Sequence, residues 1–154
     1  MTGVLAQISV SAGGMPKLPV DTALVTAHGV GGDRQHNMKY HSGPDRAVCL
    51  YSVEWYAWLR EQGVDLAYGQ VGENFTTRGI DLLELHEGDY LSVGVCLIQL
   101  ASVRVPCKQL NMWHPNLFEL ITGRTGWLAR VVREGSVKAG DAIALANEPA
   151  GSIS

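Results

Sequence analysis

The sequence has few cysteines, little charge and no long apolar run. Its three cysteines, Cys49, Cys96 and Cys107, are an odd number and lack the close spacing of zinc knuckles. We therefore expect neither a disulfide framework nor a cysteine-rich zinc site, and we expect a reducing, cytoplasmic location. Because no apolar run could span a bilayer and no basic region precedes an apolar core at the N-terminus, we expect no membrane span and no signal peptide.

Positive charge is also scarce. The 154 residues include 12 Lys and Arg against 15 Asp and Glu, a formal net charge of −3. Proteins that bind nucleic acid broadly neutralise its phosphates with Lys and Arg, so we expect no nucleic-acid partner. The apolar fraction of 46% predicts a compact protein, and the length suits one domain with one core.

Glycine is abundant, with 18 residues spread along the chain. This punctuation predicts many short strands joined by turns. We expect strands at Val4–Val10, Ala23–Thr26 and Ala47–Tyr51, with a Gly-rich loop at 29–32 and the third strand buried on both faces. Gly-Asp pairs at 88–89 and 140–141 precede further apolar strands. The alternation slips between Leu97 and Ile98, which indicates a bulge.

Two helices are expected. Ser52 is a suitable N-cap for a helix that ends near Gly63, and Pro115 is a suitable first residue for a helix over 115–122. Many strands with few helices predict a mainly β fold with flanking helices, a closed or nearly closed β-barrel with the helices packed outside. We expect one domain over residues 1–146 and a flexible tail over 147–154.

The segment Arg104-Val105-Pro106-Cys107-Lys108 is the most informative one. We expect Cys107 to end a strand, and it follows Pro106, which donates no backbone N–H. The cations on either side favour the thiolate, the form that attacks electrophiles and binds soft metals. The alternative is a buried filler, which is how we interpret Cys49 and Cys96.

A second candidate site is basic and Gly-rich. Residues 31–34 and 39–46 combine flexible glycines with Arg and Lys side chains, a pattern that suits phosphate or another anion. The alternative is a solvated turn in which Asp33 and Asp45 pair with Arg34 and Arg46. His28, His36 and His41 with Asp33 match no standard zinc spacing.

Two further segments have alternatives as well. Glu73 and Asn74 could line a pocket beside Gly72, or they could form a plain turn into a strand that starts at Phe75. Trp127, between Arg124 and Arg130, could cover a planar ligand. Alternatively, Trp127 is a core residue that follows a helix terminator.

Six segments, in order, resemble the MOSC family, the domain found at the C-terminus of molybdenum-cofactor sulfurases. They are GVGGDRQ (29–35), KYHSGPDRAVCLYS (39–52), VGENFTTRGID (71–81), EGDYLSVG (87–94), VRVPCKQL (103–110) and TGRTGWLARVVREGSVKAGD (122–141). The last segment is most similar to the stand-alone bacterial branch typified by N-hydroxylated-purine resistance proteins. The chain departs from the family pattern at Ser42, Val103 and Gln109.

The resemblance implies a MOSC barrel of the pyruvate-kinase-barrel-like type that binds the molybdenum cofactor (Mo-molybdopterin). The family is also associated with pyridoxal phosphate. Cys107 is then expected to ligate molybdenum as the catalytic residue, or to carry a persulfide. Cofactor-binding residues implied by the resemblance are Asp33, Arg34, Lys39, His41, Gly43, Asp45, Arg46, Glu73, Asn74, Thr76, Arg104 and Lys108, with Trp127 and Arg130 near the pocket mouth.

The implied activity is reduction of N–O bonds in small N-hydroxylated compounds. Related reductases carry an added iron–sulfur domain after the barrel, whereas this sequence has no further cysteines after Cys107, so we expect electrons from a separate flavin or iron–sulfur protein. The alternative is a sulfur-carrier or cofactor-delivery module without redox turnover, loaded by a cysteine desulfurase. The residues do not indicate the substrate or the oligomeric state.

Overall fold

Seven strands of this chain close into a barrel. The computed structural model describes residues 1–13, 15–33 and 43–149. The barrel strands are β1 (Thr2–Val10), β5 (Val48–Ser52), β6 (Phe75–Arg78), β7 (Tyr90–Val93), β8 (Cys96–Val103), β9 (Trp127–Arg133) and β11 (Ala142–Ala146). Their order around the barrel is β11-β7-β8-β9-β5-β6-β1, and β1 pairs with β11 to complete the circle. The mainly β, closed barrel predicted from the sequence is thus confirmed.

Every neighbouring pair in the barrel is antiparallel except β5 and β6, which run parallel. A parallel pair needs a crossover, and here α2 (Val53–Glu61) lies between the two strands in the chain. β2 (Leu18–Val20) extends the sheet beyond β1. A second sheet contains β10 (Gly135–Lys138), β3 (Thr22–Thr26) and β4 (Gly29–Val30).

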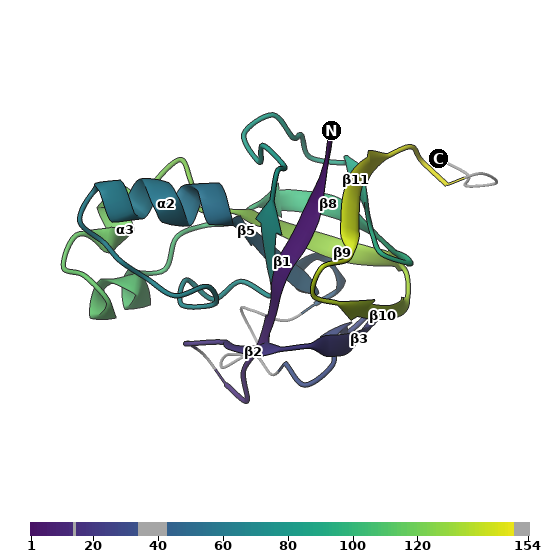
Figure 1. Cartoon of the computed structure of the whole chain (residues 1–154), viewed down its shortest axis with the longest axis horizontal. Coiled ribbons are helices and arrows are strands. Elements are labelled where there is room, and N and C mark those ends of the chain that lie inside the picture. The colour runs from purple at the N-terminus through teal and green to yellow at the C-terminus, as the bar shows by residue number, and fades with distance from the viewer. Residues whose placement is uncertain (14, 34–42, 150–154) are drawn as a thin grey trace.

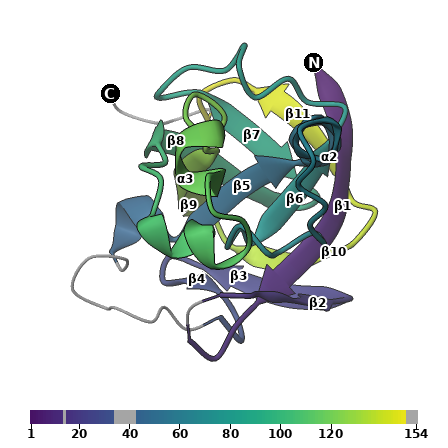
Figure 2. The ribbon, with the colours of Figure 1, turned by 90° about the vertical axis from the view of Figure 1, so that its left-hand side faces the viewer.

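The short helices gather at one end of the molecule. α2, α3 (Leu117–Leu120) and the 3-10 helix η2 (Lys108–Met112) form that end, while β3 and β10 lie beneath the barrel (Figure 1). Seen from that end, η2 and α3 stand in front of the barrel strands (Figure 2). Another 3-10 helix, η1 (Pro44–Arg46), precedes β5.

Burial explains why these segments form strands. All five residues of β5 are buried, as the continuous apolar run predicts for a strand covered on both faces. Tyr51 contacts the rings of Trp55 and Tyr56 edge-on, with centroids 5.2 Å and 5.0 Å apart, and so joins the barrel core to α2. The predicted bulge is present, because the β8–β9 register shifts between Leu97 and Ile98.

The first predicted helix is confirmed. Ser52 caps α2 by accepting a hydrogen bond from the Trp55 amide at 3.1 Å, and Gly63 follows the helix with φ +87°. The second helix is shorter than predicted, because α3 begins only at Leu117. Asn116 is its N-cap and Pro115 precedes the cap, so Pro115 does not occupy the first helical position.

Two local expectations need correction. Part of the predicted glycine loop, Gly29–Val30, pairs with β3 as a short strand. Cys107 does not end a strand: β8 stops at Val103, and Cys107 is instead the N-cap residue of η2. At the C-terminus, β11 ends at Ala146, and most of the predicted tail, residues 150–154, lies outside the described part. Among the described helices, none has the length and apolar character needed to cross a membrane.

Candidate functional site

The loop from Val103 to Cys107 is tied to the turn before β9. The Arg104 amide donates to the Gly126 carbonyl at 2.9 Å, and the Thr125 hydroxyl donates to the Arg104 carbonyl. Cys107 is half-buried, and its carbonyl accepts from the Leu110 amide at 3.0 Å. Cys107 is a free thiol, as are Cys49 and Cys96. The loop therefore presents a partly accessible thiol on a fixed backbone.

Arg104 directs part of its guanidinium group into the protein. Its Nη1 atom is buried and has no hydrogen-bond partner among the described residues. The hydroxyl of Tyr51 is buried and unpartnered in the same way. An unpaired buried donor costs free energy, so such groups commonly mark a place where a ligand or water completes the hydrogen bonds.

Gly72 makes room for this arginine. A Cβ atom at Gly72 would stand 3.1 Å from Nη2 of Arg104 and 3.3 Å from Sδ of Met15. Gly72 also has φ +96°, a conformation that side-chain-bearing residues rarely adopt. The backbone conformation at position 72 and the narrow gap to Arg104 therefore both favour glycine at this position.

Asp33 is the centre of a buried polar group. Its carboxylate accepts from Lys17 Nζ at 2.7 Å, from the Ser11 amide at 2.9 Å and from Asn74 Nδ2 at 2.9 Å. The Asn74 side chain also accepts from the Cys49 amide at 2.9 Å. These bonds join the segment after β1, the end of the glycine turn and the start of β6. Asp33 and Asn74, predicted separately, therefore meet, and Lys17 completes their charge balance.

Glu73 lies in a second buried group. Both carboxylate oxygens are 2.7 Å from the Tyr56 hydroxyl that donates to them, and Thr76 Oγ1 donates to Oε2 at 2.8 Å. The Gly69 amide donates to Oε2 at 3.0 Å. Burial raises the pKa of Glu73, while these hydrogen bonds oppose the rise. Burial, followed by the charge of Glu73, likewise raises the pKa of Tyr56.

Cys49 lies within range of both buried groups. Burial raises the pKa of its thiol, and the positive charge of Arg104 is the largest opposing influence. The charges of Glu73, Lys17 and Asp33 also act on this thiol. The interpretation of Cys49 as a buried residue is confirmed, and so is that of Cys96, whose thiol donates to the Gly135 carbonyl at 3.2 Å.

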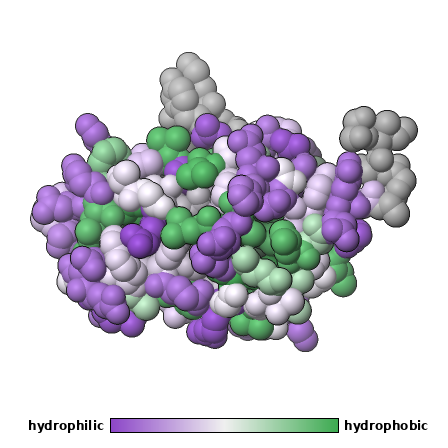
Figure 3. Space-filling view, turned by 90° about the horizontal axis from the view of Figure 1, so that it is seen from above, coloured by the Kyte–Doolittle hydropathy of each residue, from purple (hydrophilic) through white to green (hydrophobic). Residues whose placement is uncertain are grey.

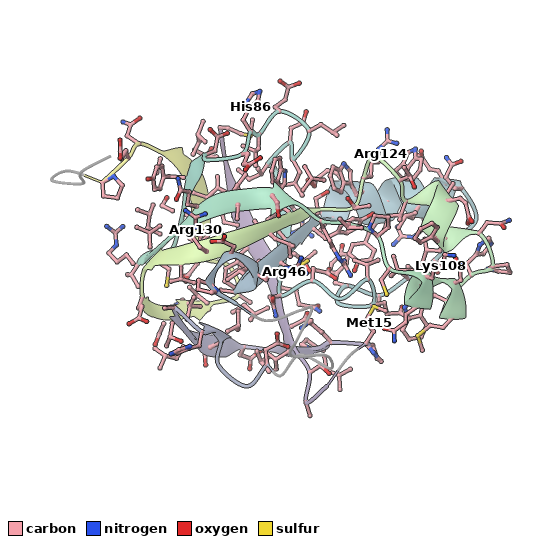
Figure 4. The ribbon with its side chains drawn as sticks, turned by 180° about the vertical axis from the view of Figure 1, so that it is seen from behind. Met15, Arg46, His86, Lys108, Arg124 and Arg130 are labelled. Atoms are coloured by element: carbon pink, nitrogen blue, oxygen red, sulfur yellow. The ribbon has the colours of Figure 1, made fainter. Side chains whose placement is uncertain are left out.

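Other predicted residues are placed apart from these groups. Asp45, in η1, forms an exposed ion pair with Arg130 of β9 at 2.9 Å, and Arg130 also donates to Gln99. Asp45, which the alternative interpretation pairs with Arg46, is thus joined to β9 by Arg130. Gly43 is the N-cap residue of η1, with φ +119°, and Arg46 ends that helix. Figure 4 shows Arg46 and Arg130 well separated from Lys108.

Lys108 and Trp127 have different surroundings. Lys108 is exposed, with Nζ 6.0 Å from the centre of the Phe118 ring. Trp127 is buried and its indole N–H donates to the Leu82 carbonyl at 2.9 Å, which favours the interpretation of a core tryptophan. Arg34, Lys39 and His41, together with His36, lie outside the described residues. Elsewhere in the described part, no three His, Cys, Asp or Glu side chains gather as a metal-binding cluster.

Three residues at the buried polar groups around Asp33 and Glu73 were not predicted from the sequence: Lys17, Tyr51 and Tyr56. Lys17 stands outside every motif, and only the fold brings it to Asp33. Tyr51 and Tyr56 fall within an apolar strand and helix pattern, although their hydroxyls lie among the polar groups. The one available signal is that Tyr56 precedes Leu59 by three residues, a spacing that puts both on the inward face of α2.

Comparison with known proteins places this arrangement in a family. The MOSC domain profile matches residues 37–144, and this chain belongs to the MOSC domain family. The chain is 38% identical over 133 residues to protein YiiM of Escherichia coli, an alignment that covers 80% of this chain and 59% of YiiM. A protein named reductase from Gibberella moniliformis is 34% identical, over 80% of this chain and 24% of its own length.

Solved structures agree with the fold. The crystal structure of YiiM from Geobacillus stearothermophilus matches with a TM-score of 0.78 and 27% identity, over 99% of this chain and 79% of that one. A hypothetical protein matches with a TM-score of 0.79 and 31% identity, over 95% and 69%. The chain thus spans about three fifths of the length of the E. coli relative and a larger share of the solved structures.

The residues present fit the cofactor with which MOSC domains are linked. Cys107 supplies a thiol, and thiolates are natural ligands for soft metals. Arg104 supplies an unfilled guanidinium donor three residues earlier, and Gly72 leaves space against it. A thiol and, on the same loop, a guanidinium group with an unpartnered donor are groups that suit an anionic, metal-bearing ligand.

Proposed function

We propose that this protein holds the molybdenum cofactor with Cys107 as a metal ligand and reduces N-hydroxylated compounds. The observation that carries the proposal is the buried, unpartnered Nη1 of Arg104 on the same tethered loop as the Cys107 thiol. Family membership supports the cofactor, and the reductase name of one relative supports redox chemistry.

The chain's own residues have distinct roles in this proposal. Cys107 provides the thiolate that binds the metal. Arg104 binds an anionic group of the cofactor through its free donor, and Gly72 permits the approach. Lys17, Asp33 and Asn74 hold three segments of the site together through charge-assisted hydrogen bonds, so that the binding groups are set before the ligand arrives.

The reaction balances as R–NHOH plus two electrons and two protons giving R–NH2 and water. When bound, the cofactor supplies the two-electron redox centre. Cleavage of the N–O bond consumes the electrons, which an external donor replaces. The hydroxyl group leaves as water with one of the two protons, and the nitrogen takes the other.

The test is metal and pterin analysis after expression in a host that makes the cofactor. We expect molybdenum and pterin in the wild-type protein and strong loss of both in Cys107→Ala, with Cys96→Ala as a buried-thiol control. Loaded protein should reduce a simple hydroxylamine or amidoxime with a chemical reductant. Wild-type protein without molybdenum or pterin would overturn the proposal.

A second function is favoured by the half-buried state of Cys107, because a sulfur carrier needs a thiol that another enzyme can reach. In this alternative Cys107 receives a sulfur atom from a cysteine desulfurase as a persulfide. Mass spectrometry after incubation with a desulfurase and cysteine distinguishes the two. A persulfide on Cys107 without bound molybdenum supports the carrier, and an unmodified thiol excludes it.

A further inference from the structure

Only two buried side-chain nitrogen or oxygen atoms lack a hydrogen-bond partner in the described part of the chain. They are the Tyr51 hydroxyl and Nη1 of Arg104. Tyr51 is fully buried, with an exposed fraction of 0%. Folded proteins satisfy nearly all such atoms, because a buried polar atom without a partner costs free energy. Two such atoms beside the same turn therefore indicate a common missing partner.

Both residues flank the turn at 124–126. The Arg104 amide donates to the Gly126 carbonyl at 2.9 Å, and the Thr125 hydroxyl donates to the Arg104 carbonyl. A Cβ atom on Gly126 would stand 3.4 Å from Cδ1 of Tyr51. The turn that holds the Arg104 backbone thus lies directly against the Tyr51 ring.

The Arg104 side chain also reaches neighbours of Tyr51. A Cβ atom on Gly72 would stand 3.1 Å from Nη2 of Arg104, and the adjacent Val71 amide donates to the Tyr56 hydroxyl at 3.3 Å. The Tyr56 ring in turn contacts the Tyr51 ring, with centroids 5.0 Å apart. The backbone and the guanidinium group of Arg104 are therefore both next to residues that contact Tyr51.

A second arginine lies at the same place. Arg124 begins the turn, and its guanidinium carbon lies over the Trp58 ring of α2, 4.2 Å from the ring centre. Trp58 follows Trp55 by one helical turn, and the Trp55 ring contacts Tyr51 edge-on. Figure 4 shows Arg124 at the end of the molecule that α2 and α3 form. Neither Arg124 nor Arg104 is in an ion pair with a described residue.

The charges around the Tyr51 hydroxyl favour an anion. Burial raises the pKa of Tyr51 and the charge of Glu73 raises it further, while the charges of Arg104 and Arg124 lower it. Glu73 already accepts hydrogen bonds from two hydroxyl groups and an amide. Two guanidinium groups without an anionic partner and one phenolic donor therefore remain beside a carboxylate whose hydrogen bonds are already made.

Acidic residues also lie at this end of the molecule, but on its surface. Glu61, Asp65 and Glu119 are exposed, and Asp65 pairs with Arg60. Seen from above, hydrophilic side chains are interspersed with apolar ones there (Figure 3). Water and salt screen exposed charges more than buried ones, so these acids weigh less on a buried ligand than the two arginines beside Tyr51 do.

We propose that the Tyr51 hydroxyl, Arg104 and Arg124 form a binding site for a phosphate-like oxyanion. A guanidinium group donates hydrogen bonds and accepts none, so the ligand must be an acceptor. One guanidinium fork satisfies a carboxylate, whereas donors from β5, from the loop before η2 and from the turn before β9 suit an oxyanion with more oxygens. The proposal deepens the proposed function, in which Arg104 alone binds an anionic group of the cofactor.

The first experiment uses metal-free protein with inorganic phosphate as the probe, so its result does not depend on molybdenum. Isotope-labelled protein is titrated with phosphate, acetate or chloride at constant ionic strength, and the amide shifts are followed by NMR. We expect saturable shifts at Tyr51, Arg104 and Arg124 with phosphate and weaker binding of acetate. Absence of saturable phosphate binding, or equal binding of acetate, would overturn the assignment.

Two matched pairs of variants locate the bound phosphate. Tyr51→Phe and Arg124→Gln should each weaken phosphate binding roughly tenfold, because each loses a hydrogen bond to a charged group. Tyr90→Phe removes a half-buried tyrosine hydroxyl on β7, and Arg60→Gln removes an exposed cation on α2. Each control should change binding less than about twofold. Equal effects in test and control variants, or a bridging water between Tyr51 and Arg104 that phosphate does not displace in a crystal structure, would refute the site.

Loaded protein identifies the source of the oxyanion. Loss of phosphate binding once the cofactor is bound would assign the site to the phosphate group of the cofactor, and unchanged binding would assign it to a free anion. Either result supports the site. Wild-type protein that binds phosphate but never acquires molybdenum would contradict the proposed function and leave the oxyanion site standing. Molybdenum-loaded protein whose metal-free form binds no phosphate would do the reverse.

Discussion

Gly72 packs against the guanidinium group of Arg104: a Cβ atom there would stand 3.1 Å from Nη2. The contact links the turn before Glu73 to the loop that carries Cys107. A side chain at position 72 would therefore move a guanidinium group that has a buried, unpartnered donor among the described residues.

Gly72→Ala should lower cofactor retention more than it lowers stability. We expect a loss of about 1–2 kcal/mol in unfolding free energy from the positive φ and a larger proportional loss of bound molybdenum. Gly88→Ala is the control, because Gly88 has φ +93° with open space around it. The variants should be compared by thermal melting and metal analysis. Equal molybdenum loss in both would contradict a specific role for the contact.

Lys17→Met should be strongly destabilising. The Lys17 and Asp33 side chains are 10% and 5% exposed, so removing the lysine leaves a buried carboxylate without its cation. The expected loss is about 3 kcal/mol in denaturant unfolding. Arg60→Met breaks an exposed ion pair and should cost less than about 1 kcal/mol. A small effect at Lys17 would show that Asn74 and Ser11 suffice to hold Asp33.

Glu73→Gln should change how stability depends on pH. Because burial raises the pKa of Glu73, the folded state binds its proton more tightly than the unfolded state does. The stability that protonated Glu73 contributes is fully present when the pH is below the ordinary pKa of 4.5. It is lost as the pH rises through the higher pKa of the folded state. The difference in melting temperature between the Glu73→Gln variant and wild type should therefore shift in favour of the variant as pH rises. A difference that is constant with pH would contradict the raised pKa.

Tyr51→Phe and Tyr56→Phe should behave differently. The Tyr51 hydroxyl is buried without a partner among the described residues, so its removal should leave metal-free protein equally or more stable. The Tyr56 hydroxyl donates to Glu73 and accepts from the Gly69 amide, so its loss should cost about 2 kcal/mol. Denaturant titration of both variants decides this. A destabilised Tyr51→Phe would mean that water or another group already satisfies the hydroxyl.

Much of the fold is predictable because strand periodicity is local. β1, β3 and the slip at Leu97 follow from the pattern of apolar residues, β5 follows from a continuous apolar run, and Ser52 marks the start of α2. The length of α3 was not predictable, because Pro115 can stand before a helix as well as inside its first turn. Closure of the barrel by β1 and β11 depends on pairing residues far apart in the sequence.

The candidate site was only partly predictable for a related reason. A cysteine after proline between two cations is a local signal, and so Cys107 could be singled out. The pairing of Asp33 with Lys17 and of Asp45 with Arg130 joins residues from separate elements, so neither pair can be found from sequence proximity. The sequence around Glu73 suits a plain turn as well as a pocket, and only the arrangement of β6 against α2 buries this residue beside Tyr56.

The most direct test of the central claim is molybdenum X-ray absorption on protein loaded with cofactor, comparing wild type with Cys107→Ser. This measurement counts the sulfur atoms bound to the metal without relying on activity. We predict that the variant retains some cofactor under excess loading and shows one sulfur ligand fewer than the wild type. Identical sulfur counts in the two proteins would contradict ligation by Cys107.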